Sequence, residues 1–229
     1  MDDVPPPYSP SRSAQLQTPP YSPSRSGQQQ RSSSSTQLLT YQLRQINRKH
    51  QTLVPLGPVA VPSYSIQKNS VTGFFMKRPD ITISRMSSPE LIDGVVANVH
   101  LDRSSSYPWV PRATIRYEDA GTLDQHLALE DFQRCRWKVD IGGVPHHWST
   151  VFYPTSLVLA EEQTGAIQAT FIYSEYGTAA YGGQEVGQFS IIYNLQDADT
   201  VRIEQVFFSA CQVISFWKDM GRAFSNSGG

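Results

Sequence analysis

The sequence predicts a β-rich α+β protein with one compact body, built on an antiparallel sheet or a jelly-roll-like core, a C-terminal helix and a disordered N-terminal arm. Three observations predict this class. Apolar and polar residues alternate in many segments after residue 71, apolar residues recur at helical spacing near the chain end, and residues 1–51 consist mainly of Ser, Gln, Pro and Arg. A period of two is typical of strands and a period of three to four of helices. We therefore place an arm at residues 1–51 and a folded body at residues 52–229.

The arm has few apolar residues before Leu38. Such a segment buries too little surface to offset the conformational entropy lost on ordering, which predicts disorder. Leu39, Leu43 and Ile46 share one face at helical spacing, which indicates a short helix where the arm ends. The rest of the chain is long enough for a single hydrophobic core.

Two segments show the strand pattern most clearly. Residues 95–101 alternate, and Cys135, Trp137, Val139 and Ile141 alternate with charged residues before a Gly-Gly pair ends the run. This pattern places the apolar set on one face of a sheet and the charges in water. Further strands are predicted at residues 80–85, 113–118, 148–153, 156–161, 166–174 and 186–194, with a hairpin turn at 162–165.

The period changes near the end of the chain. An apolar stripe at spacings of three and four comprises Ile203, Val206, Phe207, Ala210, Val213, Ile214, Trp217 and Met220. This predicts a helix that covers the sheet or enters a partner, and Phe208 and Phe216 widen the stripe, which indicates deep burial. Residues 124–133 are predicted as a second, shorter helix.

The formal net charge of −1 conceals an uneven distribution. Residues 4–51 contain six basic side chains and no acidic one, whereas residues 52–229 contain 13 basic and 18 acidic residues. A basic arm on an acidic body is suited to anionic lipid, nucleic acid or its own body, and the alternative is a solubilising tail. The basic residues of the arm are Arg12, Arg25, Arg31, Arg44, Arg48 and Lys49.

Cysteine usage and hydropathy indicate an intracellular protein. Cys135 and Cys211 both lie in apolar patterns, and we expect two reduced, buried thiols rather than a disulfide. The sequence shows no signal peptide and no apolar stretch long enough to span a membrane.

The arm contains an eight-residue repeat, because residues 6–13 return unchanged as residues 19–26. With Pro5 in front, the first copy reads Pro5-Pro6-Pro7-Tyr8 and matches the Pro-Pro-x-Tyr motif that WW domains bind. Prolines favour the polyproline II form, which reduces the entropy lost when such a peptide docks in an aromatic-lined groove. Pro5 to Tyr8 are therefore the predicted WW-binding site.

Two further segments are weaker candidates. In the second copy Thr18 replaces the first proline, so Pro19, Pro20 and Tyr21 are a partial motif that adds affinity by proximity or is a remnant of duplication. Tyr153, Pro154 and Leu157 match the Tyr-Pro-x(n)-Leu pattern bound by ESCRT-associated adaptors. The alternative for this third segment is a turn between two strands of the body.

No group of residues predicts catalysis, a cofactor or a metal. His146 and His147 are adjacent, and neighbouring residues on a strand point to opposite faces, so they suit one ion poorly. Gly182-Gly183 lacks the Lys-Ser/Thr that follows in a phosphate-binding loop. We expect a non-enzymatic protein.

With its Pro-Pro-x-Tyr arm before a body of this size, the chain resembles matrix proteins of enveloped negative-strand RNA viruses, the rhabdovirus type in particular. The resemblance rests on Pro5, Pro6 and Tyr8 and on the layout of the chain. It implies a late domain that recruits host WW-domain HECT ubiquitin ligases and, through them, ESCRT. It also implies self-association, peripheral membrane contact, binding to the nucleocapsid, and a location in the virion, the host cytoplasm and the inner face of host membranes.

Two alternative functions remain open at the level of sequence. Residues 94–103 resemble the strand that ends in Asp and a basic residue in plant-virus movement proteins of the tobamovirus superfamily, which implies binding to single-stranded nucleic acid. The same Pro-Pro-x-Tyr motif also suits a cellular WW-domain-binding adaptor or ubiquitin-ligase substrate.

Overall fold

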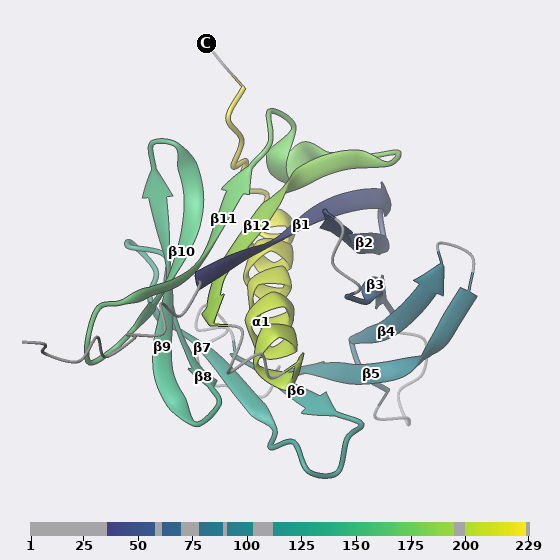
Figure 1. Cartoon of the computed structure of the whole chain (residues 1–229). Helices are drawn as coiled ribbons and strands as arrows, with labels where there is room; N and C mark the ends of the chain where they lie inside the picture. Colours follow the sequence, from purple (N-terminus) through teal and green to yellow (C-terminus); the bar gives the residue numbers. More distant parts are fainter. Residues whose placement is uncertain are drawn as a thin grey trace, which may run out of the picture. The chain divides into compact units, whose positions relative to one another are not determined.

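In the part of the chain that the structure describes, a closed antiparallel barrel of 12 strands surrounds one long helix (Figure 1). The computed structural model describes residues 36–57, 61–69, 78–88, 91–102, 112–194 and 200–227. The strands are β1 Thr36–Asn47, β2 His50–Leu56, β3 Ser63–Lys68, β4 Ile81–Ser88, β5 Leu91–Leu101, β6 Arg112–Tyr117, β7 Gln125–Asp131, β8 Arg136–Ile141, β9 Val144–Phe152, β10 Thr155–Glu161, β11 Ile167–Tyr173 and β12 Gln184–Asn194. The helix α1 spans Thr200–Asp219.

The barrel is an up-and-down meander. Each strand pairs with its neighbours in the chain, and β1 pairs with β12 to close the ring, with Tyr41 opposite Phe189. The predicted α+β class with a jelly-roll-like core is therefore wrong, because the described residues form one closed sheet with one long helix. Closure depends on two strands about 150 residues apart, and no local pattern specifies that pairing.

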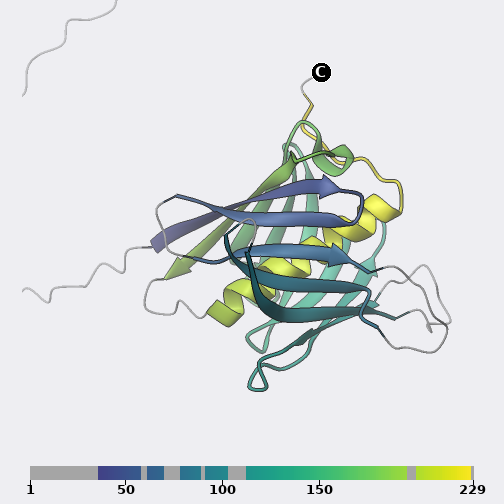
Figure 2. The same cartoon turned by 90° about the vertical axis from the view of Figure 1, so that its right-hand side faces the viewer.

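The helix fills the interior of the barrel. Barrel diameter grows with strand number, and 12 strands enclose more space than their own inward side chains can fill. A helix about 10 Å wide with its side chains occupies that space. In the rotated view of Figure 2, α1 runs between the near strands β2–β4 and the strands behind it. This position explains why its burial extends beyond the predicted stripe to Phe208 and partly to Phe216.

Aromatic contacts link the helix to the wall. The Phe207 ring lies 4.4 Å from that of Tyr41 and 5.3 Å from that of Phe189, measured between ring centroids. At the other end of the helix, the Trp217 and Trp137 ring centroids are 6.2 Å apart in an edge-on arrangement. Offset and edge-on ring pairs add stabilisation beyond buried area, so these contacts fix the helix in the barrel.

Residues 36–51 belong to the barrel rather than to the predicted arm. They form β1, the turn after it and the start of β2, and the predicted helix over Leu39, Leu43 and Ile46 is wrong. Leu39, Tyr41, Leu43 and Gln45 are all buried, which is the period of two that a strand requires. The inward Gln45 is polar and obscured the alternation.

The shorter helix predicted at residues 124–133 is also wrong. This segment is β7, in which Gln125, Leu127 and Leu129 point inward and are buried. Here again a glutamine takes an inward position of the strand. Its side-chain amide donates to the backbone oxygens of Asp140, at 2.9 Å, and Gln205, at 3.3 Å, which satisfies the buried polar group.

The strands predicted over the second half of the chain are confirmed, with small shifts at their ends. β8 has Trp137, Val139 and Ile141 buried as expected. The predicted hairpin at residues 162–165 joins β10 to β11. Strands with a clear hydrophobic period were therefore predictable one by one, whereas their arrangement as a barrel was not.

The C-terminal tail packs against the loop before β12. This loop contains the short 3₁₀ helix η1, Gly177–Ala179. The Thr178 amide donates to the Phe224 carbonyl at 3.0 Å, and the Phe224 amide donates to the Thr178 hydroxyl at 3.0 Å. The Phe224 ring stacks on Tyr173 with the centroids 5.5 Å apart. The tail thus closes one end of the aromatic core.

Gly177 lies where this closure is tightest. A Cβ at this position would lie 1.7 Å from the Phe224 carbonyl oxygen, and φ is +49°. We expect Gly177→Ala to lower the free energy of unfolding by about 1–3 kcal/mol more than Gly182→Ala, measured by urea denaturation, because it adds an overpacking cost. Gly182 is the matched control, since its φ is +62° and a Cβ added there would meet no atom within 4 Å. Equal losses in the two variants would show that the tail does not press on Gly177.

Candidate functional site

The structure describes only some of the predicted site residues. Pro5, Pro6, Pro7 and Tyr8, the partial motif Pro19, Pro20 and Tyr21, and Arg12, Arg25 and Arg31 all lie outside the described residues. Arg44 lies on β1, and Arg48 and Lys49 form the turn between β1 and β2. These last two are exposed and sit at the mouth of a pocket described below.

The Tyr153 segment joins β9 to β10. The Tyr153 side chain is 95% exposed, whereas Leu157 is fully buried inside the barrel. The Asn226 side chain accepts a hydrogen bond from the Thr155 amide at 2.7 Å and donates to its carbonyl at 3.0 Å, so the tail holds this turn. A partner that reads both Tyr153 and Leu157 would have to draw Leu157 out of the core.

The two adjacent histidines point to opposite faces of β9, as predicted. His146 is on the inward face with Trp148, and its ring nitrogen lies 2.7 Å from the Val144 carbonyl. His147 lies on the outer face, with Nε2 3.0 Å from the Glu130 carboxylate. Over the described ranges, no three His, Cys, Asp or Glu side chains are grouped as metal ligands.

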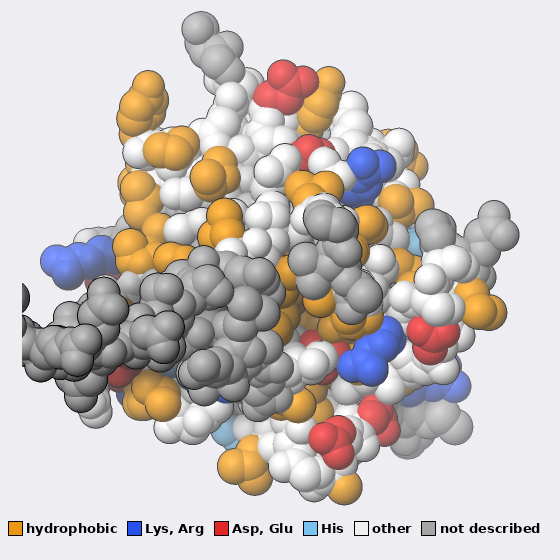
Figure 3. Space-filling view, in the orientation of Figure 1, with side chains coloured by type: hydrophobic (Ala, Val, Ile, Leu, Met, Phe, Trp, Pro, Cys, Tyr) orange, Lys and Arg blue, Asp and Glu red, His pale blue; other side chains and the backbone are white. Residues whose placement is uncertain are grey.

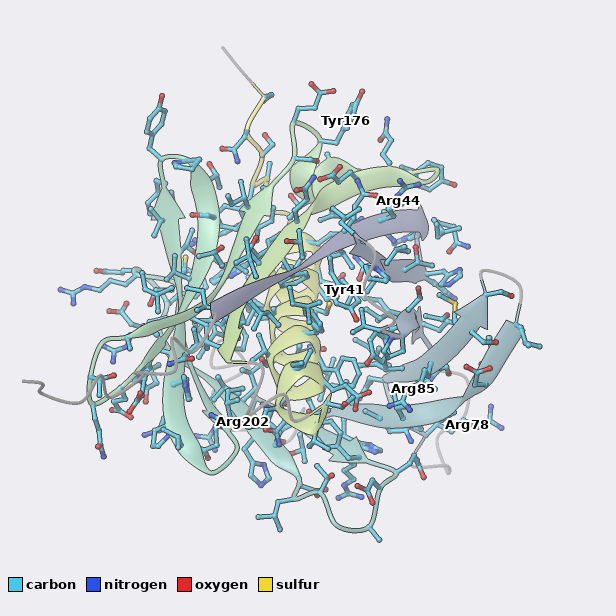
Figure 4. The ribbon with its side chains drawn as sticks, viewed as in Figure 1. Tyr41, Arg44, Arg78, Arg85, Tyr176 and Arg202 are labelled. Carbon is cyan, nitrogen blue, oxygen red and sulfur yellow. The ribbon has the colours of Figure 1, made fainter. Side chains whose placement is uncertain are left out.

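A buried carboxylate ties α1 to the barrel wall. Glu204 on α1 accepts a hydrogen bond from the Tyr64 hydroxyl at 2.8 Å, and its Oε1 lies 2.6 Å from Nη2 of Arg85. Figure 4 shows Tyr41 and Arg85 on the same side of α1. Burial and the nearby Glu204 charge raise the pKa of Tyr41, Tyr64 and Tyr117. Both contacts are made by Oε1 and join α1 to β3 and β4, so this carboxylate anchors the helix to the wall.

A pocket of about 600 Å³ opens beside the C-terminal end of α1. In Figures 1 and 2 this end of the helix lies on the same side of the barrel as the β1–β2 turn. Among the described residues, four basic side chains line the pocket, Arg48, Lys49, Lys68 and Lys218, together with one carboxylate, Asp219. Three elements that are distant in sequence therefore contribute its charge.

The floor of this pocket is a hydrogen-bonded polar network. Gln51 Nε2 donates to Gln45 Oε1 at 2.8 Å, and Lys218 Nζ donates to the same oxygen at 2.9 Å. Gln45 and Gln51 are both buried. These contacts hold the Lys218 ammonium in one place at the end of the helix. Burial, and then the positive charge of Lys68, lower the pKa of Lys218.

The sequence predicted only part of this pocket. Arg48 and Lys49 were noted as basic residues, but as members of an arm. Lys68 and Lys218 gave no local signal, since each is a single lysine in an amphipathic segment. The inward glutamines of β1 and β2 were the one available sign, because a buried polar pair at a barrel end needs polar partners.

Apolar side chains gather on another part of the surface. On the face shown in Figure 3 they lie mainly over β9–β12. Phe152 is 67% exposed beside Tyr153, and Leu38 and Ile192, which are opposite each other on β1 and β12, are also exposed. Exposed apolar groups that cluster in this way are typical of contact surfaces.

The fold and the pocket together define a helix-filled antiparallel barrel with its polar pocket at one end. In comparisons with protein-family models, curated proteins and solved structures, nothing matches this chain.

Proposed function

We propose that this chain is a non-enzymatic assembly protein of the matrix type, in which the Pro5–Tyr8 segment recruits WW-domain HECT ubiquitin ligases. The observation on which the proposal rests is the complete Pro-Pro-x-Tyr motif at one end of a basic segment. In this function the barrel contacts the inner face of the membrane, the nucleocapsid and other copies of the chain, while the motif brings in the budding machinery.

The filled interior supports a function performed on the surface. Many barrels of similar size bind a ligand in their lumen, but here α1 occupies that space with side chains such as Phe207, Phe208 and Trp217, all fully buried. Contacts with partners must then use the outer face, the ends of the barrel and the N-terminal segment.

The exposed apolar side chains over β9–β12 support contact with a membrane or with another copy. Phe152 and Tyr153 project at the β9–β10 turn, where an aromatic pair is suited to the membrane–water interface. The proposal places this contact at the membrane surface. No helix among the described residues is long and apolar enough to span a bilayer.

The motif is tested by Tyr8→Ala. We expect this change to weaken binding of the full chain to an isolated WW domain by about tenfold or more, because the tyrosine ring fills its own pocket on the domain. Binding is measured by isothermal titration calorimetry, and particle release from expressing cells is measured in parallel and should fall.

Tyr21→Ala is the matched control, since Thr18 interrupts the second motif, and we expect a change of less than about threefold. Equal binding by the wild type and Tyr8→Ala would exclude the motif as the docking site. Normal WW binding without particle release would instead favour the cellular adaptor.

A further inference from the structure

We propose that the pocket at the C-terminal end of α1 is a binding site for a compact polyanion carrying at least two phosphate groups. The site is separate from the Pro5–Tyr8 motif, so either can fail without affecting the other. The following observations on charge, preorganisation and size support it.

The pocket concentrates positive charge on a body that is acidic overall. Residues 52–229 have five more acidic than basic residues, yet the pocket wall has four basic side chains and one carboxylate. A concave surface lined by one sign of charge focuses the electrostatic potential and attracts ligands of the opposite sign. The excess of positive charge in this hollow therefore favours an anion.

The one carboxylate among the described lining residues contacts Lys68 rather than Lys218. Both Asp219 oxygens lie 2.8 Å from Lys68 Nζ, so Asp219 is taken up by one lysine. Lys218 has neutral acceptors, Gln45 Oε1 at 2.9 Å and the Ala180 carbonyl at 3.5 Å. A half-buried ammonium beside a second lysine is stabilised by a bound anion, which would oppose the effects that lower its pKa.

The nearby helix terminus does not reverse this preference. The C-terminal end of a helix carries about half a negative charge, which disfavours an anion. Arg48, Lys68 and Lys218 exceed Asp219 by two positive charges, which outweighs that half charge. Lys218 in the last turn of α1 also places a positive charge beside the helix end.

The site is largely preformed. Gln45 is fixed by donating through Nε2 to the carbonyls of Asn47 and His50, and it positions Lys218 in turn. Lys68 is held by its ion pair with Asp219. A ligand that meets groups already in place loses less affinity to ordering them.

The size and chemistry of the pocket indicate the ligand class. A volume of about 600 Å³ suits a small molecule rather than a single ion. A guanidinium binds two phosphate oxygens at once, and ammonium groups add point charges. Arg48 on the turn, Lys68 on β3 and Lys218 on α1 come from three different elements, and a ligand with two phosphate groups offers enough oxygens to engage all three.

The test is a titration of the full chain with tripolyphosphate at low salt, in which binding is measured by isothermal titration calorimetry. We expect saturable binding that weakens as salt is raised, and a loss of about tenfold or more in Arg48→Ala and in Lys218→Met. Arg48 is exposed on a turn, so its variant tests the site without risk to the fold. Lys138→Met is the matched control, since Lys138 lies on β8 beside Glu162, outside the pocket, and binding should be unchanged.

A second arm distinguishes a free phosphate compound from a lipid headgroup. Vesicles of phosphatidylcholine alone and of phosphatidylcholine mixed with phosphatidic acid are sedimented with wild type and Arg48→Ala. Binding to tripolyphosphate but not to either vesicle identifies a soluble ligand, and Arg48-dependent binding only to phosphatidic acid vesicles identifies a headgroup. Binding to neither probe, or equal binding by wild type, Arg48→Ala and Lys218→Met, overturns the proposal.

Discussion

Replacing Phe208 with Ala is expected to lower the free energy of unfolding by about 3–5 kcal/mol. The Phe208 ring is fully buried in the middle of the barrel, with its centroid 5.3 Å from that of Tyr64 and 6.1 Å from that of Tyr117. The strands that surround the ring are paired on both sides, so the wall cannot collapse into the space that the truncation leaves. The lost free energy of transfer of the ring and the cost of the unfilled cavity then add together in the destabilisation.

The measurement is urea denaturation followed by tryptophan fluorescence, because Trp137, Trp148 and Trp217 are all buried in the barrel. Met220→Ala is the control, since Met220 follows the helix and is 54% exposed, and its expected change is within about 0.5 kcal/mol. Similar losses in the two variants would mean that α1 does not fill a closed barrel.

The sequence predicted the inward face of the strands with a clear hydrophobic period but not the number of strands. Trp137, Val139 and Ile141 show a clear period of two, and the structure confirms them as buried. Gln45 and Gln125 occupy equivalent inward positions in other strands and break that period with polar groups. Their burial depends on partners that only the folded barrel brings close, so a local pattern could not assign those segments.

The burial of the helix could be predicted from the sequence, but its position inside a closed barrel could not. Its stripe and the wider apolar ring with Phe208 predicted deep burial, which is confirmed for Val206, Phe208 and Trp217, whereas Met220 follows the helix and is exposed. Burial beneath one sheet and burial inside a closed barrel give nearly the same hydrophobic pattern. A closed barrel differs from an open sheet by the pairing of β1 with β12, in which Thr40 lies opposite Ser190. Outward polar pairs of this kind have no distinctive sequence pattern, so the pairing could not be predicted.

The pocket was less predictable than the fold. Its basic residues come from the β1–β2 turn, the end of β3 and the end of α1, separated by up to about 170 residues. Lys218 contacts Gln45 across this separation. Sequence motifs with a fixed spacing detect sites whose residues lie on one element. A site formed where three elements meet has no such spacing in the sequence.

Alkaline pH is expected to unfold the barrel cooperatively between about pH 10 and 11.5. Burial raises the pKa of Tyr41, Tyr64, Tyr117 and Tyr173, and the Glu204 charge adds to this in the first three. Above the ordinary tyrosine pKa of about 10, the unfolded chain therefore releases protons that the folded chain retains. Stability is fully present below about pH 9 and falls as pH rises.

The size of the effect follows from the number of tyrosines. Each contributes about 1.4 kcal/mol per pH unit once its unfolded form is ionised, so four contribute about 5 kcal/mol per unit. A domain with an ordinary stability of about 5–15 kcal/mol loses much of it within little more than one unit. The buried Cys211 thiol, whose pKa burial raises to about 12, acts in the same direction, and Lys218 opposes it weakly because its pKa is lowered.

Urea midpoints measured at a series of pH values, with phenolate absorbance recorded in parallel, test this expectation. Tyr173→Phe is the most informative variant, because its buried hydroxyl has no hydrogen-bond partner and its loss removes one titrating group without removing a bond. The pH slope should fall by about a quarter while stability at neutral pH is kept. A wild-type midpoint that stays constant from about pH 9 to 11 would contradict the burial of these four hydroxyls.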